Sequence, residues 1–293
     1  MSRDLPLWAA HLRPWLILGR VSNLPTVWSN VLAGWLLGGG ERLGALVLVL
    51  AGTSCIYVAG MFLNDVVDVE FDREHRQERP IASGQVSWLA VLLVAMGLMA
   101  AGVVLVGLGG VPAFVFGLLL VLAVVVYDLV HKLVSFAPVV MALCRYLLVL
   151  VAGAAGAEGV TGLVVWSALA LGLYVLGLSY VARGESRGGG FPLWPIPGLA
   201  VPLLLAVLVN PPSIWFFPAV LLPLALLVVW LVRCLRPLVR PGPEGPRRAV
   251  SGLLAGIVLV DLVATIPFGW PWGWVFLAFF AGALMLQRSV PAT

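Results

Sequence analysis

Charged residues are scarce in this sequence. Only 10% of its 293 residues are Asp, Glu, Lys or Arg, whereas 62% are hydrophobic. Soluble domains carry about a quarter charged residues, so the composition excludes a protein whose surface lies mainly in water. Apolar stretches of about 20 residues, enough to cross roughly 30 Å of hydrocarbon, recur along the chain. The sequence therefore predicts one integral membrane domain over residues 1–293.

Cysteine is equally sparse. Cys55, Cys144 and Cys234 lie far apart without metal-ligand or redox spacing, which argues against a disulfide framework and a zinc site. The first fourteen residues lack the apolar core of a cleavable signal peptide, so we expect the first spanning helix to direct insertion. The formal charge of +4 comes without a basic patch interleaved with aromatic residues, and we expect no nucleic-acid partner.

The apolar stretches predict an all-α fold, a polytopic transmembrane bundle of nine or ten helices. The run Pro-Phe-Gly-Trp-Pro-Trp at residues 267–272 either separates two helices or kinks a longer one. The expected spans are residues 15–38, 43–65, 87–108, 111–130, 134–155, 161–182, 192–209, 213–235, 249–268 and 271–287.

The positions of Lys and Arg predict the orientation, because short cytoplasmic loops are enriched in them. If the N-terminus is cytoplasmic, all of the 17 Lys and Arg residues except Arg42 and Arg145 lie at or near the inner face. We therefore expect a multi-pass protein of the cell inner (plasma) membrane, surrounded by membrane lipids. The N-terminus and the mouth of any active site should face the cytoplasm.

Acidic residues gather in one short segment. Six of the thirteen fall between Asp65 and Glu78. On a helix, Asn64, Asp65, Asp68 and Asp72 lie within one arc of about 100°. Carboxylates at this spacing repel one another unless a cation neutralises them, and carboxylate oxygens suit Mg²⁺, which bridges protein to phosphate groups. The segment therefore predicts a magnesium site that binds a diphosphate.

Basic residues follow the acidic ones. Arg73, Arg76 and Arg79 precede the run Pro-Ile-Ala-Ser-Gly at residues 80–84, and such a cationic loop suits bidentate contacts to phosphate. The alternative is a solvated helix end where acids and bases only pair with each other. That alternative explains the arginines but not three carboxylates on one face of a helix that continues an apolar span.

These motifs resemble the first aspartate-rich motif of the UbiA superfamily of intramembrane prenyltransferases. Residues 64–72 read Asn-Asp-x-x-Asp-x-x-x-Asp and residues 79–84 read Arg-Pro-Ile-x-x-Gly. Residues 19–26 resemble the start of the family's first helix, and residues 127–132 resemble its basic turn after the fourth helix. The resemblance implies transfer of a prenyl group from a prenyl diphosphate to an aromatic or other lipophilic acceptor, with Mg²⁺.

The resemblance also implies roles for individual residues. Four are assigned to the metal, with the amide as an alternative diphosphate ligand: Asn64, Asp65, Asp68 and Asp72. Four basic residues are assigned to the diphosphate oxygens: Arg79, Lys132, Arg20 and Arg73. Metal and cationic groups would stabilise charge on the departing diphosphate, and apolar walls would keep water from the allylic cation.

The sequence departs from the family at the end of the sixth helix, where the second motif, DxxxD, is absent from residues 173–186. Glu185 is a candidate for one carboxylate, and Arg183 for a fixed cation in place of a second magnesium. Otherwise both are ordinary loop charges. Tyr180 is a candidate for substrate contact through its ring, although a tyrosine in a span more often packs.

Arg145 lies in the middle of an expected span, where an ionised group must face a cavity or a partner. It either orients an acidic or phenolic acceptor or pairs with Asp128 or Asp261.

Three function classes follow from the whole sequence. A membrane prenyltransferase leads, a prenyl- or lipid-binding carrier that has lost the second metal site comes next, and an ion-coupled transporter is weaker because no internal repeat supports it.

Overall fold

The computed structural model describes residues 7–185, 194–209, 218–239 and 245–291. These residues form helices and no strand. The α-helices are α1 (Leu7–Leu18), α2 (Leu24–Leu37), α3 (Leu43–Val67), α4 (Val69–His75), α5 (Trp88–Leu108), α6 (Val111–Val130), α7 (Ala137–Ala154), α8 (Gly162–Glu185), α9 (Ile196–Val209), α10 (Pro218–Val239), α11 (Gly245–Ala264) and α12 (Trp270–Leu286). Two short 3₁₀ helices, η1 (Val21–Asn23) and η3 (Ile266–Phe268), complete the described structure.

The prediction of an all-α membrane protein is confirmed, and a long helix lies within or across each of the ten expected ranges. By length and composition, six of the described helices suffice to cross a membrane: α3, α5, α6, α7, α8 and α10. The number of spans, nine or ten, stays a prediction. Residues 267–272 separate two helices, since α11 ends at Ala264 and α12 begins at Trp270, after Gly269 with φ 82°.

The expected single helix over residues 15–38 is wrong. The chain leaves the helix after Leu18, and Arg20 takes the left-handed conformation, with φ 41°, before η1 and α2 begin. Pro25 explains part of this, because it has no amide proton for the carbonyl four residues earlier. The Tyr57 hydroxyl donates to the carbonyl oxygen of Arg20 (3.3 Å) and helps to hold this uncommon backbone.

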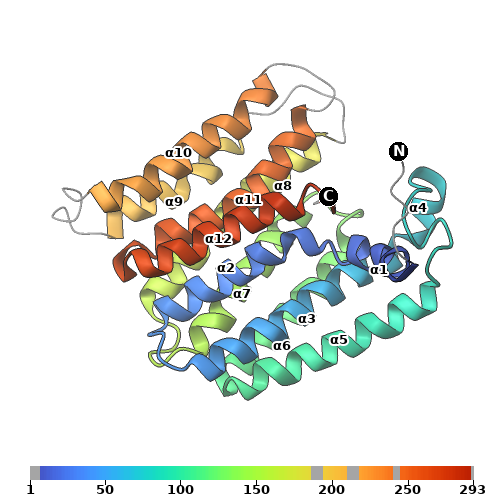
Figure 1. Ribbon diagram of the computed structural model, residues 1–293, viewed down its shortest axis with the longest axis horizontal. Helices are drawn as coiled ribbons and strands as arrows, with labels where there is room; N and C mark the ends of the chain where they lie inside the picture. The colour runs from blue at the N-terminus through green and yellow to red at the C-terminus, as the bar shows by residue number, and fades with distance from the viewer. Residues whose placement is uncertain (1–6, 186–193, 210–217, 240–244, 292–293) are drawn as a thin grey trace.

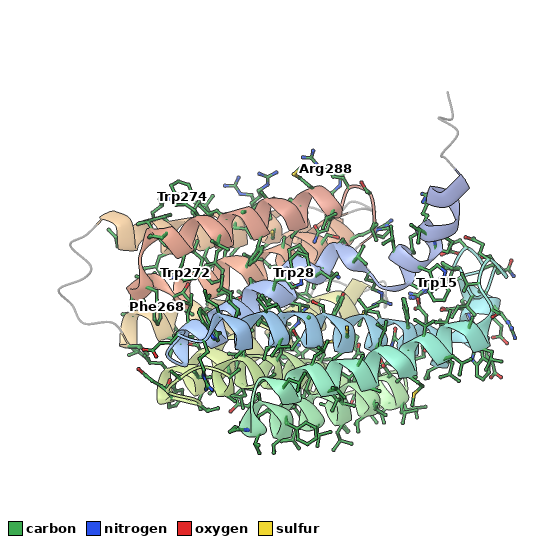
Figure 2. The ribbon with its side chains drawn as sticks, turned by 60° about the horizontal axis from the view of Figure 1, so that its bottom comes forward. Trp15, Trp28, Phe268, Trp272, Trp274 and Arg288 are labelled. Carbon is green, nitrogen blue, oxygen red and sulfur yellow. The ribbon has the colours of Figure 1, made fainter. Side chains whose placement is uncertain are left out.

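The long helices lie side by side across the bundle (Figure 1). Helices α2, α7, α8 and α11 contribute most of the apolar core, whereas α5 and α10 turn large apolar side chains outward, as lipid-facing helices do. Figure 2 shows Phe268, Trp272 and Trp274 toward one end of the bundle and Trp15 toward the other. Aromatic residues near both ends suit the two interfaces of a membrane.

Helices α2 and α7 pack backbone against backbone. A Cβ added at Gly34 would lie 2.6 Å from the carbonyl oxygen of Val149, so only glycine permits this approach. The close packing places the polar side chains of Thr26 and Asn30 on α2 within reach of Arg145 on α7.

The two ends of the bundle differ in charge. At one end the Ser22 hydroxyl donates to the carbonyl oxygen of Pro291 (3.4 Å), so the chain after α12 returns to η1 beside Arg20. The opposite end carries the α2–α3 turn, where Arg42 donates to the carbonyl oxygen of Gly156 (3.1 Å). Most of the described basic residues belong to the first end, which we call the basic end.

Candidate functional site

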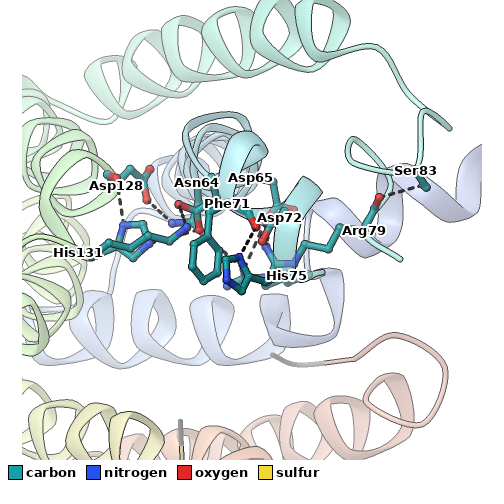
Figure 3. A network of polar contacts seen from close by, with 12 residues as sticks. Asn64, Asp65, Phe71, Asp72, His75, Arg79, Ser83, Asp128 and His131 are labelled. Carbon is teal, nitrogen blue, oxygen red and sulfur yellow. Dashed lines mark hydrogen bonds and ion pairs between the residues drawn. The ribbon is translucent and has the colours of Figure 1, made fainter. Parts of the chain in front are cut away.

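The acidic cluster, defined as Asn64, Asp65, Asp68 and Asp72, lies at the basic end where α3 passes into α4 (Figure 3). Asn64 and Asp65 belong to the last turn of α3, Asp68 links the two helices, and Asp72 lies within α4. The amide of Asp68 donates to Asn64 (3.0 Å) and that of Asp72 to Asp68 (2.9 Å), so the helical path continues across the junction. Each of the four residues is no more than 6% exposed. Buried carboxylates need charged or hydrogen-bonding partners.

Two arginines approach one side of the cluster. The Nη1 atom of Arg79 forms ion pairs with Asp65 Oδ1 and with Asp72 Oδ2, the latter at 3.2 Å. The Nη2 atom of Arg20 lies 3.7 Å from Asp65 Oδ1 and donates to Asn64 Oδ1 (3.3 Å). The break in the helix after α1 therefore places the Arg20 side chain beside the acidic cluster.

Arg79 reaches the cluster from the connection between α4 and α5. There the amide of Ser83 donates to the carbonyl oxygen of Arg79 (2.8 Å), and the amide of Gln85 to that of Pro80 (3.0 Å). Gly84 closes this turn with φ 76°, a conformation that glycine adopts without steric cost. The run Arg-Pro-Ile-x-x-Gly thus folds the loop back and directs its arginine onto the carboxylates.

Asp68 has basic partners from the turn after α6. Lys132 Nζ lies 2.6 Å from Asp68 Oδ1 and 3.9 Å from the centre of the Phe71 ring, and His131 Nε2 lies 3.4 Å from Asp68 Oδ2. Burial acts to raise the pKa of Asp68, but the hydrogen bonds from His131 and Lys132 outweigh it and leave this pKa below its usual value. The bond to Asp68 raises the pKa of His131 despite burial. Both directions favour a charged pair.

Asp128 was expected only as a partner of Arg145, not beside the acidic cluster. Asn64 Nδ2 donates to Asp128 Oδ1 (3.1 Å), and Asp128 is 1% exposed. The sequence did contain a signal for Asp128, since Asp128, His131 and Lys132 have the i, i+3, i+4 spacing of one helical face. That face meets the acidic cluster.

The donor set fits a hard divalent cation in its chemistry. Among the described residues, no three Asp, Glu, His or Cys side chains already form a metal-binding group. However, Asp72 Oδ1 and Asp128 Oδ2 are buried without a hydrogen-bond partner, and such carboxylate oxygens are rare in folded proteins. Oxygen atoms of carboxylates and amides are the ligands that Mg²⁺ takes.

Arg145 lines a cavity of about 80 Å³ between α2, α3, α6 and α7, together with Asp128, Tyr57 and apolar side chains. Its Nη1 atom donates to Asn30 Oδ1 (2.8 Å) and its Nη2 atom to Thr26 Oγ1 (3.1 Å). The expected alternative of a direct ion pair with Asp128 or Asp261 is not found among the described residues.

Asn30 bridges Arg145 to Asp261 instead. Asp261 Oδ2 accepts hydrogen bonds from Asn30 Nδ2 (2.6 Å) and from the Ser29 hydroxyl (2.5 Å). The carboxylate fixes the direction of the Asn30 amide, so the amide oxygen faces the guanidinium. We call Thr26, Ser29, Asn30, Arg145 and Asp261 the mid-bundle network.

Arg183 and Arg73, two further predicted residues, form no ion pair with the acidic cluster. Arg183 donates to the backbone oxygens of Ser135 (2.5 Å) and Val134 (3.0 Å), in the connection that carries Lys132. Arg73 is exposed and forms no ion pair within the described part of the chain.

Tyr180 packs edge-on against Trp194, with ring centres 4.4 Å apart. Glu185 ends α8, but its side chain lies outside the described structure. The described contacts of the Tyr180 ring therefore do not include the acidic cluster.

Comparisons with known proteins place this geometry in context. A model of the UbiA prenyltransferase family matches residues 23–240, which include the acidic cluster and end before α11. The digeranylgeranylglyceryl phosphate synthase of Metallosphaera sedula is 32% identical over 118 residues, 40% of this chain and 42% of that protein. The 4-hydroxybenzoate octaprenyltransferase of Cupriavidus pinatubonensis is 33% identical over 100 residues, 33% of this chain and 34% of that protein. The chain thus spans less than half the length of these curated relatives.

Solved structures share the fold over nearly the whole chain. One, from work on digeranylgeranylglyceryl phosphate synthase in membranes, has a TM-score of 0.61 at 21% identity and covers 94% of this chain and 99% of that one. A UbiA homologue from Archaeoglobus fulgidus, solved with Cd²⁺, has a TM-score of 0.52 at 15% identity, with coverage of 94% and 99%. At these identities the likeness concerns the fold alone.

Proposed function

The chain belongs to the UbiA prenyltransferase family, and we propose on that premise that it transfers a prenyl group from a prenyl diphosphate to a lipophilic acceptor, aromatic or other, inside a membrane with the help of Mg²⁺. One observation carries the proposal. Three buried aspartates converge with Arg20, Arg79 and Lys132, and one carboxylate oxygen, Asp72 Oδ1, has no hydrogen-bond partner. This arrangement suits a metal-bridged diphosphate better than a closed set of salt bridges.

The reaction sets the requirements. The bond between C1 of the prenyl group and the diphosphate oxygen breaks, and its electron pair goes to the diphosphate. The acceptor forms a bond to C1 and loses a proton. When bound, Mg²⁺ would supply a Lewis acid to stabilise the negative charge on the leaving diphosphate.

We assign Asn64, Asp65, Asp68 and Asp72 to hold the metal. The cations that now pair with these carboxylates are then available to the diphosphate oxygens. Arg79 and Arg20 offer planar bidentate donors, and Lys132 offers a compact charge from the other side of the cluster. Arg73, exposed beside the cluster, is a further candidate for the outer oxygens.

The cavity lined by Arg145 is the proposed seat of the acceptor. Asn30 and Thr26 accept two of the five N–H donors of the guanidinium, so others are available to an acidic or phenolic oxygen. Asp128 lines the same cavity and bonds to Asn64, which connects the acceptor cavity to the acidic cluster. The apolar lining would keep water from an allylic cation.

Arg183 receives a different role from the one that the sequence suggested most directly. Its two bonds to the backbone after α6 make it a positioning residue for Lys132. Direct contact of Arg183, Tyr180 or Glu185 with substrate remains a prediction. We place the basic end, and with it the N-terminus and the mouth of the site, on the cytoplasmic side of the plasma membrane, because basic residues concentrate there.

A carrier of prenyl diphosphates is the second candidate. Residues 173–186 lack the second aspartate motif, and all three cluster aspartates already have cationic partners. A chain with this arrangement can bind a diphosphate without releasing it.

The test is diphosphate release by the full chain in lipid nanodiscs. Geranyl, farnesyl and longer prenyl diphosphates are supplied with or without Mg²⁺ and with or without a membrane-lipid extract as the acceptor source. Magnesium-dependent release that is lost in Asp68→Asn and retained in Glu70→Gln, an exposed acid of the same segment, supports the transferase. Tight binding of every diphosphate without release overturns it in favour of the carrier.

A further inference from the structure

A second charged cavity lies at the basic end, between α10, α11 and α12. It has a volume of about 560 Å³, and among the described residues its lining includes Arg233, Arg247, Arg248 and Arg288 but no acidic residue. We call it the arginine pocket. Three of these arginines lie beyond residue 240, where the match to the family model ends.

The walls of the arginine pocket are held together by hydrogen bonds between helices. The Trp230 indole donates to the carbonyl oxygen of Gly252 (2.8 Å), joining α10 to α11. The Gln287 amide donates to the carbonyl oxygen of Ser251 (3.2 Å), joining α12 to α11. The pocket is therefore a fixed feature of three packed helices.

The charge of this pocket differs from that of the acidic cluster. In the cluster, each cation faces a carboxylate, whereas Arg233, Arg247 and Arg288 in the arginine pocket form no ion pair with any residue that the structure describes. Like charges around one cavity repel each other, and an anion in the cavity removes that repulsion. Guanidinium groups match the oxygens of phosphate in particular.

Membrane topology alone does not account for this arrangement. The positive-inside tendency requires basic residues at the cytoplasmic end of a helix but not around one cavity. Arg236 illustrates the difference, because it is exposed at the same end of α10 and does not line the pocket.

Apolar surface adjoins the pocket. On α10, Val229 and Val232 are 66% and 45% exposed, and on α12 Met285 is 67% exposed. Arg288 projects from the surface at the end of α12 (Figure 2). A ligand with a charged head in the pocket would thus have room for a hydrocarbon tail along α10 and α12.

We propose that the arginine pocket binds the phosphate headgroup of an anionic membrane lipid, separately from the acidic cluster. Basic pockets between transmembrane helices at the cytoplasmic face have the chemistry for such headgroups. Free phosphate or diphosphate shares the headgroup chemistry but lacks the tail.

The experiment measures lipid retention by purified full-length protein using native mass spectrometry. The probes are dioleoylphosphatidylglycerol, neutral dioleoylglycerol and inorganic diphosphate. We expect retained phosphatidylglycerol that diphosphate displaces poorly, and no retained diacylglycerol. Each substitution, Arg233→Gln or Arg288→Gln, should weaken retention about fivefold, the effect of one arginine near a charged headgroup. Arg236→Gln is the matched control and should leave retention unchanged.

Thermal unfolding in lipid-free detergent checks that each variant folds, since exposed Arg288 has no packing role that its loss would disturb. Equal retention by wild type, Arg233→Gln and Arg288→Gln overturns the proposal. Effective displacement of the retained phosphatidylglycerol by inorganic diphosphate also overturns the proposal, because the pocket would then be a site for soluble anions. The prenyl-transfer proposal is unaffected by either result.

Discussion

The acidic cluster with its two arginine partners and the mid-bundle network both combine arginine, aspartate and asparagine side chains, but their hydrogen bonding differs. In the mid-bundle network, Asp261 Oδ2 accepts two hydrogen bonds and Asn30 passes the interaction on to Arg145. None of its side-chain atoms is among those that the described structure buries without a partner. This network joins α2, α7 and α11.

At the acidic cluster, Asp72 Oδ1 and the neighbouring Asp128 Oδ2 are buried and unpartnered, although the other oxygen of Asp72 pairs with Arg79 and that of Asp128 accepts from Asn64. A buried polar atom without a partner costs about 1 to 3 kcal/mol. A polar cluster between helices can therefore either hold the helices together or bind a ligand. Unpartnered oxygens indicate the ligand site.

The largest expected effect comes from a substitution in the acidic cluster. Asp72→Asn removes one carboxylate from the proposed metal set and should reduce diphosphate release about 100-fold or more, the range for losing one stabilising group at a developing charge. The fold should remain, because asparagine can still accept the bond from Arg79. The measurement is the initial rate of diphosphate release with saturating Mg²⁺.

Glu70→Gln is the matched control for Asp72→Asn. Glu70 is an exposed acid two residues away, so its variant should keep the wild-type rate. A similar loss in both variants would mean that general negative charge, rather than a built site, controls the reaction.

The second prediction breaks the mid-bundle network. Asp261→Ala leaves the donors of Ser29 and Asn30 without their acceptor inside the bundle. The free energy of unfolding should fall by about 1 to 3 kcal/mol, the cost of leaving such groups unpaired. Thermal unfolding in detergent measures this change in stability. Unchanged stability would show that the mid-bundle network does not stabilise the fold.

Arg145 links the two regions, because it belongs to the mid-bundle network and lines the acceptor cavity. Arg145→Gln should raise KM for an acidic acceptor about tenfold, as expected for losing one charged hydrogen bond, with kcat little changed. Pairing 4-hydroxybenzoate with its neutral amide sharpens the test. An equal rise for both acceptors would assign Arg145 to structure alone.

The smallest expected effect concerns the support of Lys132. Arg183→Gln removes two bonds to the connection that carries Lys132 and should raise KM for the prenyl diphosphate several-fold, because a displaced phosphate ligand binds less well. In Arg183→Lys, the ammonium group can still donate to these backbone oxygens and should restore part of the lost affinity for the prenyl diphosphate. A decrease in kcat as large as that of Asp72→Asn would instead favour direct contact with the diphosphate.

The sequence permitted prediction of the helices and of the acidic cluster because both depend on local spacing. Residues 64–72 carry their carboxylates at helical intervals, and the run ending at Gly84 closes a local turn. The break at Arg20 was missed, since hydropathy does not distinguish a kinked apolar segment from a straight one. The bond from Asn64 to Asp128 was missed because the pairing of two helices is a tertiary property.

The roles of Arg145 and Arg183 were beyond the sequence for the same reason. Each is a basic residue at a helical position, but its partners lie more than forty residues away along the chain. The arginine pocket has an equally non-local origin, because its lining comes from three helices. Local patterns therefore predicted which residues carry charge, and packing determined which of those charges meet.

We propose above that the acidic cluster binds a divalent metal together with a diphosphate. The most direct test is electron paramagnetic resonance of Mn²⁺, used in place of Mg²⁺, titrated into the full chain in nanodiscs with farnesyl thiodiphosphate. We expect bound Mn²⁺ that requires the diphosphate analogue, is lost in Asp68→Asn and Asp72→Asn, and is retained in Glu70→Gln. Mn²⁺ that stays free in the wild type, or binds equally well to Asp72→Asn, would contradict it.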